Sequence, residues 1–306
     1  MRCPEADLAE LAAQQHAIFS RAHALGVGFS PAQIKRRLRT GAWVAVHQVA
    51  YRVAGAPITW EGELLAACWA GGFRAVASHR SAAALWDLPG GRRQPAEIVC
   101  PRWRRAQHDG LIVHESKALD RVDTDFVRAI PVTKPELTLL QMAAVCHPAV
   151  VEMAFDAAEK RELVSRHSVQ AMLQRQGKQG RNGAGVLREL LAGRKPGRRA
   201  PESAMETRLI QALRKNGFPE PLPQYEIRAG GEFIARVDVA YPQWKIAIEY
   251  DSDEYHAGQL AHRRDSTRRS KIVAAGWLPL SATLDDIKAG CMTLCAAIRT
   301  GRNRAS

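Results

Sequence analysis

Three carboxylates placed within two neighbouring apolar runs constrain this chain more than any other feature. Residues 234–251 contain two apolar-rich runs separated by a Pro-Gln-Trp sequence, the pattern of a β-hairpin. Asp238 lies in the first run, and Glu249 and Asp251 lie in the second. Side chains two residues apart on a strand point to the same face, so Glu249 and Asp251 are expected on one face.

The position of the turn predicts the register of this hairpin. A turn at residues 242–244 pairs Tyr241 with Ile246 and Val239 with Ile248. The next pair along the strands is Asp238 with Glu249. Like charges placed directly opposite each other destabilise a sheet, so a fold that keeps them needs a compensating charge. We therefore expect a divalent cation, Mg²⁺ or Mn²⁺, held by Asp238, Glu249 and Asp251 through oxygen ligands.

The charge of the chain indicates the kind of substrate. The chain has 306 residues, a net charge of +13 and an isoelectric point near 9.9. This length predicts two or three domains, and the positive balance favours a polyanionic partner, above all DNA. A cation site in so basic a protein predicts metal-assisted hydrolysis of phosphodiester bonds. Solubility alone is the alternative explanation of the charge.

Cysteine usage and hydropathy indicate the compartment. None of the six cysteines forms a Cys-x-x-Cys pair, which is typical of a reduced protein. No apolar run approaches 18 residues, and the N-terminal residues have no continuous apolar segment typical of a signal peptide. We expect a cytoplasmic protein without a membrane span.

The N-terminal region, residues 1–75, is predicted to form a winged helix-turn-helix. Residues 8–25 have the pattern of one amphipathic helix, and Ser30-Pro31 opens a second helix that stops near Gly41. Residues 43–53 are expected to form a two-stranded wing. The second helix carries the candidate DNA contacts, which are Lys35, Arg36 and Arg39. A solvated helix face is the alternative interpretation.

The central part of the chain offers no predicted catalytic constellation. Residues 76–175 are expected to form an α/β region, with a helix after Ser78 and strands near residues 96–101 and 110–114. Its histidines, His79, His108, His114 and His147, lack ligand spacing and are expected at the surface or in the core. Residues 176–200 are rich in glycine and basic residues and are predicted to be a flexible linker, which either stays solvated or follows a phosphate backbone.

The C-terminal domain, residues 201–300, is expected to contain a helix, the two strands that carry the acids, a basic helix, a short strand and a final helix. Ser203 and Glu206 have the spacing of a capping box at the start of the first helix. Glu206 also shares a helix face with Leu209 and Leu213. Its side chain is therefore expected either to cap the helix or to point towards the core. Together the three regions predict a multidomain protein of the α+β or α/β class.

This C-terminal pattern resembles the PD-(D/E)xK nuclease superfamily, and within it the very-short-patch-repair endonucleases. The motifs are Glu206, Arg236-Val237-Asp238, Ile248-Glu249-Tyr250-Asp251, Tyr255-His256, Asp265-Ser266-Thr267-Arg268-Arg269 and Ala274-Ala275-Gly276-Trp277. The resemblance implies a restriction-endonuclease-like αβββαβ core and a metal bound by Asp238 and Glu249. It also implies that His256 is an acid or base, that Glu206 supports the metal, and that Arg268 has a role in the site.

Two departures from that family concern the second acidic strand. Asp251 stands where the common motif has a lysine, which orients the attacking water and stabilises negative charge. Ser252 stands where the family commonly has glycine. Beyond the acids, the helix near residues 259–275 is strongly basic, and we expect Arg264, Arg268 and Arg269 to contact phosphates.

The N-terminal half resembles the AbiEi class of antitoxins, which have a winged helix. The likeness covers roughly residues 10–150 and lies in residues 30–53, 78–86 and 130–133. It implies DNA binding and repression of the protein's own operon. The alternative to an endonuclease is therefore a transcriptional regulator or antitoxin with an inert nuclease-like domain, whose expected partner is a toxin encoded nearby. Cleavage of RNA is a third hypothesis.

Overall fold

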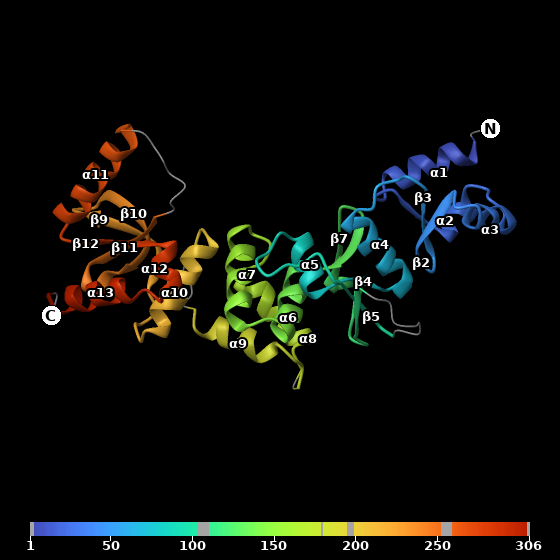
Figure 1. The fold of residues 1–306 in the computed structure, drawn as a ribbon. Coiled ribbons are helices and arrows are strands. Elements are labelled where there is room, and N and C mark those ends of the chain that lie inside the picture. Colours follow the sequence, from blue (N-terminus) through green and yellow to red (C-terminus); the bar gives the residue numbers. More distant parts are fainter. Residues whose placement is uncertain (1–2, 103–109, 179, 195–198, 252–258, 305–306) are drawn as a thin grey trace. The chain divides into compact units, whose positions relative to one another are not determined.

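The computed structural model describes residues 3–102, 110–178, 180–194, 199–251 and 259–304, with backbone alone for residues 259–266. Within these residues the chain is a mixed α/β protein with thirteen α-helices and three small sheets (Figure 1). Its contacts define two compact units. Unit 1 comprises Met1–Cys146 and His167–Leu187, and unit 2 comprises His147–Arg166 and Arg188–Ser306. The domain boundaries expected from the sequence at residues 75, 175 and 200 stay predictions.

Unit 1 begins with a small three-stranded sheet and three helices. In chain order the elements are α1 (Pro4–Ala13), β1 (Ile18–Ser20), α2 (Arg21–Gly26), α3 (Pro31–Arg39), β2 (Trp43–His47) and β3 (Ala50–Val53). The sheet order is β1-β3-β2. The helix after Ser30 and the strand pair after it are confirmed, and Ser30 caps α3 through a reciprocal capping box with Gln33.

The single helix expected over residues 8–25 is wrong. The chain turns at His16 and Ala17, whose φ angles of 55° and 63° are left-handed and end the helical path. The next residues form β1, in which Ile18 pairs with Arg52 of β3. A tertiary strand pairing has thus overridden a helical sequence pattern.

Aromatic side chains hold α3 and this sheet together. The Phe19 and Trp43 rings meet edge to face with centroids 4.7 Å apart, and Phe29 meets Trp43 at 5.0 Å. The Arg37 guanidinium lies over the Phe29 ring at 4.7 Å and pairs with Glu5. Arg37 therefore belongs to the packing, unlike the other basic residues of its helix.

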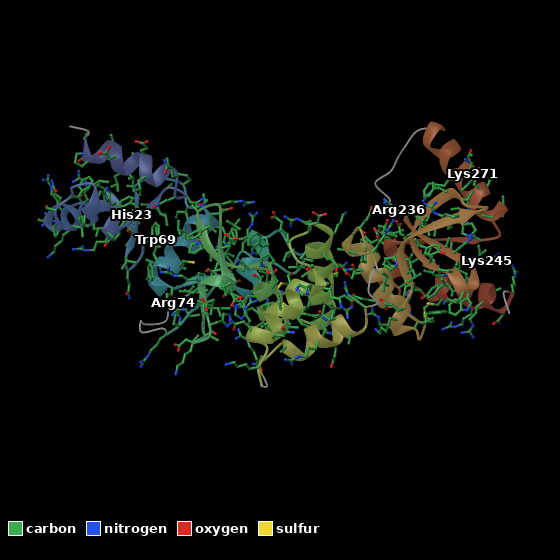
Figure 2. All side chains as sticks on the ribbon, turned by 180° about the vertical axis from the view of Figure 1, so that it is seen from behind. His23, Trp69, Arg74, Arg236, Lys245 and Lys271 are labelled. Carbon is green, nitrogen blue, oxygen red and sulfur yellow. The ribbon has the colours of Figure 1, made fainter. Side chains whose placement is uncertain are left out.

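The remainder of unit 1 is built on a five-stranded mixed sheet of order β6-β5-β4-β8-β7. Its elements are α4 (Trp60–Gly71), β4 (Val76–Ala77), α5 (His79–Leu85), β5 (Ala96–Cys100), β6 (Leu111–Glu115), β7 (Thr124–Val127), β8 (Ile130–Thr133), α6 (Pro135–Val145) and α8 (Arg166–Gln176). The predicted helix after Ser78 and the two predicted strands are confirmed. His23 of α2 meets Trp69 of α4 edge to face at 5.2 Å, and both side chains are labelled in Figure 2.

Unit 2 contains a four-stranded sheet of order β12-β11-β10-β9. Its elements include α7 (Pro148–Lys160), α10 (Ala204–Lys215), β9 (Leu222–Ala229), β10 (Glu232–Tyr241), β11 (Ile246–Asp251), α11 (Gln259–Ala274), β12 (Leu278–Thr283), α12 (Leu284–Lys288) and α13 (Met292–Arg304). Helix α11 covers one face of the sheet, and α10, α12 and α13 lie on the other (Figure 1). The predicted helix, two acid-bearing strands, basic helix, short strand and final helix are present, and β9 is a further strand that the local patterns did not predict.

The described residues of the glycine-rich segment 176–200 include one short helix and one buried arginine. They contain α9 (Ala184–Ala192), and Arg194 is buried, where it pairs with Asp156 at 2.5 Å and with Glu159 at 3.4 Å. The Arg194 guanidinium also lies 4.6 Å from the centre of the Phe155 ring. Arg194 is therefore not solvated, because acids of α7 that are distant in the sequence pair with it.

Two glycines of this segment give a matched test of packing. Both have a left-handed backbone, with φ of +84° at Gly183 and +82° at Gly180. A Cβ on Gly183 would lie 2.5 Å from the Leu140 carbonyl oxygen, whereas a Cβ on Gly180 meets nothing within 4 Å. We expect Gly180→Ala to lower stability by about 1 kcal/mol from backbone strain. Gly183→Ala adds overpacking against α6 and should cost about 3 kcal/mol in total. Thermal unfolding of both variants checks this, and equal losses would contradict the close approach.

Candidate functional site

The hairpin formed by β10 and β11 has the predicted register. Tyr241 pairs with Ile246 and Val239 pairs with Ile248, and these side chains are buried in the core of unit 2. Asp238 precedes Val239 on β10. Its Oδ2 accepts a hydrogen bond from the Tyr250 N–H at 2.8 Å. Asp238 is thus fixed by the backbone of the neighbouring strand.

An amide links Asp238 to a second acid. In the pairing of β9 with β10, Gln224 falls opposite Asp238, between the Tyr225–Val237 and Pro223–Val239 pairs. The Gln224 Nε2 donates to Glu206 Oε2 at 2.8 Å and to Asp238 Oδ1 at 3.3 Å. Gln224 is 5% exposed and has a left-handed φ of 51°, a strained conformation that tertiary contacts must hold. We call Glu206, Gln224 and Asp238 the acid–amide cluster.

Glu206 enters this cluster from the first turn of α10. Its N–H donates to the Ser203 hydroxyl at 3.1 Å, so that half of the predicted capping box is confirmed. Its side chain does not return to the Ser203 N–H and instead accepts from the Glu202 N–H at 2.8 Å. Burial raises the pKa of the Glu206 carboxyl, and the nearby Asp238 charge adds to this effect, although the hydrogen bonds from Glu202, Gln224 and Ser203 oppose it.

The two acids of β11 have separate surroundings. Glu249 pairs with Arg268 of α11 at 2.5 Å, and Arg268 also donates to the Arg236 carbonyl oxygen. Asp251 is exposed at the end of the strand, where it pairs in register with Thr283 of β12. The expected convergence of Asp238, Glu249 and Asp251 is thus not seen as a group of three ligand atoms within 4.8 Å among the described residues. Asp238 instead meets Glu206 through Gln224.

The other residues predicted for this site are His256, Arg264 and Arg269. His256 and the side chain of Arg264 lie outside the described residues. Arg269 is exposed and donates to the Pro279 carbonyl oxygen at 3.3 Å. Arg236 of β10 and Lys271 of α11 are exposed basic side chains of the same unit, and both are labelled in Figure 2.

The basic face of α3 is open to solvent. Lys35, Arg36 and Arg39 are exposed, while Ile34 on the opposite side is fully buried. Among the described acids, none forms an ion pair with these three side chains, whereas Arg37 is held by Glu5. Charges without internal partners are available to an external polyanion.

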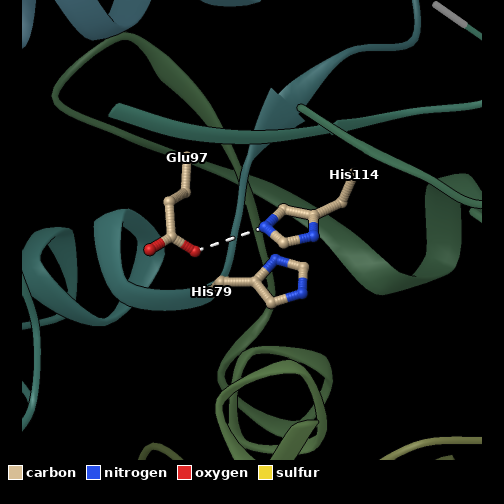
Figure 3. A group of neighbouring side chains, drawn as sticks. All are labelled: His79, Glu97 and His114. Atoms are coloured by element: carbon tan, nitrogen blue, oxygen red, sulfur yellow. Dashed lines mark hydrogen bonds and ion pairs between the residues drawn. The ribbon is translucent and has the colours of Figure 1, made fainter. Parts of the chain in front are cut away.

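A second cluster of ionisable side chains lies in unit 1, and it was not predicted from the sequence. His79 at the start of α5, Glu97 of β5 and His114 of β6 each offer a ligand atom, and these atoms lie within 4.8 Å of one another (Figure 3). The two imidazole rings stack with centroids 3.4 Å apart, and His114 Nε2 lies 3.3 Å from Glu97 Oε2. We call these residues the histidine cluster. The only hint in the sequence was a polar residue in each of two predicted apolar strands.

The surroundings set the charge of the histidine cluster. Burial, followed by the proximity of His114, lowers the pKa of His79 to about 3. Burial alone would raise the pKa of the Glu97 carboxyl, but hydrogen bonds from His114 and Arg80 outweigh it and hold that pKa below its ordinary value. At neutral pH the cluster therefore contains a neutral His79 beside an ionised Glu97.

The geometry defines a mixed α/β protein with two separate groups of ionisable side chains. No protein-family model matches the chain. Uncharacterized protein Rv2248 of Mycobacterium tuberculosis (strain ATCC 25618 / H37Rv) is 31% identical over 239 residues, which cover 76% of this chain and 83% of the relative. Uncharacterized protein MT2308 of Mycobacterium tuberculosis (strain CDC 1551 / Oshkosh) matches to the same extent. The chain belongs to the same family as these two proteins, whose names state no activity.

Membrane insertion by a helix finds no support in the part of the chain that the structure describes. None of its helices combines the length and the apolar character that a bilayer crossing requires.

The raised pKa of Glu206 predicts an unusual dependence of stability on pH. A carboxyl whose folded pKa is raised contributes stability at low pH, and this contribution is lost as pH rises through the folded pKa. Glutamine keeps the acceptor for Glu202 and Gln224 but cannot ionise. We therefore expect Glu206→Gln to raise the melting temperature at neutral pH, with the gain vanishing as pH falls below the ordinary pKa of a glutamate.

Glu152 of α7 provides the control with the opposite sign. Its pKa is lowered, because hydrogen bonds and charge from Arg214 outweigh the effect of burial. Its contribution to stability is present at neutral pH and is lost as pH falls through its folded pKa. Glu152→Gln should therefore lower the melting temperature at neutral pH. If both variants lose stability at pH 7, the account of Glu206 is contradicted.

Proposed function

We propose that this protein binds DNA and hydrolyses its phosphodiester bonds with Mg²⁺ or Mn²⁺ in unit 2. The observation that carries the proposal is the acid–amide cluster, in which the buried Gln224 links the buried Glu206 carboxylate to the half-buried Asp238 carboxylate. Two neighbouring carboxylates, one of which has a raised pKa, are typical of a site that binds a cation.

The order of the elements supports the nuclease assignment. Helix α10, strands β9 to β11, helix α11 and strand β12 follow one another as in the restriction-endonuclease-like core of the PD-(D/E)xK superfamily. Glu206 lies on the first helix, Asp238 on the middle strand of the first three, and Glu249 on the next, as in the resemblance to very-short-patch-repair endonucleases. The proposal for unit 2 combines this order with the acid–amide cluster.

The chemistry of the donor atoms fits a hard divalent cation. Glu206, Asp238 and Glu249 offer carboxylate oxygens, and Mg²⁺ and Mn²⁺ prefer oxygen ligands. We propose Asp238 and Glu249 as metal ligands with Asp251 beside them, and Glu206 as the acid that supports the site. The ion supplies Lewis acidity and a more acidic bound water when it is present.

The chain's own residues orient the acids and neutralise the substrate. The Tyr250 N–H and the Gln224 amide fix Asp238 before any substrate binds, which reduces the reorganisation needed for reaction. Arg268 pairs with Glu249 in the free chain and is placed to shift towards a phosphate once Glu249 has another positive partner. We keep His256 as the candidate acid or base on the strength of the resemblance alone.

The N-terminal elements support DNA binding. Their order of helix, strand, two helices and two strands is that of a winged helix-turn-helix, in which the third helix enters the major groove. Here the third helix is α3, and its exposed face carries Lys35, Arg36 and Arg39. The AbiEi-type resemblance points to the same role.

Cleavage of DNA is the direct test of the proposed activity. Supercoiled plasmid incubated with the full chain and Mg²⁺ or Mn²⁺ should be nicked or linearised. We expect Asp238→Asn to lower the cleavage rate on the order of 100-fold or more, because a lost metal ligand removes several kcal/mol of stabilisation from the transition state. Gel electrophoresis of the plasmid measures the rates.

Glu232→Gln is the matched control for this experiment. Glu232 lies on the same strand as Asp238 but is exposed, so its loss should leave cleavage unchanged. Cleavage by Asp238→Asn at the rate of the wild-type chain would contradict the assignment of the site.

A transcriptional regulator or antitoxin with an inert nuclease-like domain is the second candidate. The ion pair of Arg268 with Glu249 favours it, because an acid neutralised within the protein has less need of a cation. Asp251 in the position of the usual lysine favours it as well. Binding of DNA without cleavage under either metal would support this function, together with a toxin partner encoded nearby.

DNA affinity tests the role of α3 under both hypotheses. We expect the triple substitution of Lys35, Arg36 and Arg39 by alanine to weaken binding and to reduce the slope of log affinity against log salt by about 3, one for each lost phosphate contact. Fluorescence anisotropy with a labelled duplex at several salt concentrations measures both quantities.

Arg37→Ala separates an effect on binding from an effect on folding. Arg37 is held by Glu5 and lies over the Phe29 and Trp43 rings, so its loss should lower the melting temperature and leave the salt slope of the folded protein unchanged. An unchanged salt slope in the triple variant would show that α3 does not contact phosphates.

A further inference from the structure

We propose that His79, Glu97 and His114 form a binding site for a divalent transition-metal ion, with Zn²⁺ as the representative. The site is separate from the acid–amide cluster and lies in unit 1. Two imidazole nitrogens and one carboxylate oxygen form a known three-ligand set for zinc and for iron(II), and they leave further coordination positions for water or a substrate. Mg²⁺, which prefers oxygen donors, is a poor match.

The sheet brings two of the ligands together. Strands β5 and β6 are parallel, and His114 pairs in register with Val99, two residues along β5 from Glu97. Glu97, Val99 and His114 therefore share one face of the sheet. His79 reaches the same place from the first residue of α5, directly after β4, which is the other neighbour of β5 (Figure 3).

Neighbouring residues hold the ligands as they do in established metal sites. Arg80 donates to Glu97 Oε1 at 3.1 Å, which leaves Glu97 Oε2 directed at His114. The Ser78 hydroxyl lies 2.9 Å from His79 Nδ1, a contact that fixes the orientation of this ring. Partners that orient a carboxylate and an imidazole in this way raise the affinity for metal.

Backbone contacts hold His79 in an uncommon conformation. Its φ of 49° is left-handed, a region that few residues other than glycine adopt, although histidine is enriched there. The His79 N–H donates to Gln141 Oε1 at 3.3 Å, and Gln141 Oε1 also accepts from the Thr133 hydroxyl at 3.1 Å. These contacts hold the ring beside Glu97 and His114.

Binding requires one imidazole to turn. The rings are nearly parallel, with an angle of 19° between their planes. The lone pair of an imidazole nitrogen lies in the plane of its ring, so two stacked rings cannot both direct a lone pair at one ion. His114 can make this movement, because it lies on the edge strand β6 and its side chain is 26% exposed, compared with 2% for Glu97.

Zinc affinity of the full chain tests the proposal. Protein freed of metal by chelation is titrated with Zn²⁺ in competition with a chromogenic chelator. We expect one equivalent to bind at this site, with an affinity at least tenfold weaker in His114→Gln. His167→Gln removes an exposed histidine of the same unit and should bind as the wild-type chain does. Equal affinity of His114→Gln and the wild-type chain would overturn the proposal.

A measurement on the wild-type chain avoids any effect of substitution on folding. Zn²⁺ should shift the ring-nitrogen NMR resonances of two of the ten histidines, and excess Mg²⁺ should not reverse the shift. Asp238→Asn should retain this response, which makes the outcome independent of the proposed nuclease activity. The absence of a shift at both His79 and His114, or the loss of these shifts in Asp238→Asn, would overturn the site.

Discussion

Two carboxylates share one amide donor at the centre of unit 2, and the arrangement of that unit depends on this contact. Gln224 joins the buried Glu206 on α10 to the half-buried Asp238 on β10, so it links the first helix of this domain to the sheet. The contact is a poor source of stability, because burial and the charge of Asp238 raise the pKa of Glu206. A fold selected for stability alone would gain from a neutral side chain at position 206.

The sequence was sufficient wherever local chemistry determined the structure. The hairpin register followed from the strand period and from the turn at residues 242–244, and Ser30 marked the start of α3 through its capping box. The two acid-bearing strands, the basic helix and the strand after it in unit 2 followed from the same local signals, whereas β9 was not predicted from them. Sequence patterns failed at residues 8–25, because a left-handed turn at His16 and Ala17 has no strong signature and β1 exists only through its pairing with β3.

Functional groups were harder to predict than elements, since they depend on contacts between distant segments. The role of Gln224 arises from a residue on a third strand facing Asp238, and nothing in its own neighbourhood indicated it. The ion pair of Glu249 with Arg268 joins β11 to α11 and changes the surroundings of an acid that the sequence had identified. His79, Glu97 and His114 meet only because β5 and β6 are parallel neighbours and α5 begins beside them.

The two proposed sites differ in the chemistry of their donors, which allows them to be separated by experiment. The acid–amide cluster and Glu249 offer oxygen atoms alone, whereas the histidine cluster offers two nitrogens and one oxygen. A hard cation in unit 2 and a transition metal in unit 1 therefore compete little for each other's ligands. The exposed basic face of α3 is proposed to bind DNA. The residues proposed to bind DNA there therefore differ from those proposed to bind metal.

Binding of Mn²⁺ to unit 2, followed by electron paramagnetic resonance in the His114→Gln background, tests the central claim most directly, because this substitution removes the histidine cluster as a competing site. The signal of free Mn²⁺ should fall by one bound ion per chain, Mg²⁺ should restore it, and Asp238→Asn should bind no ion at the same concentrations. Equal binding of Mn²⁺ with and without Asp238→Asn, or no binding in either protein, would contradict the account.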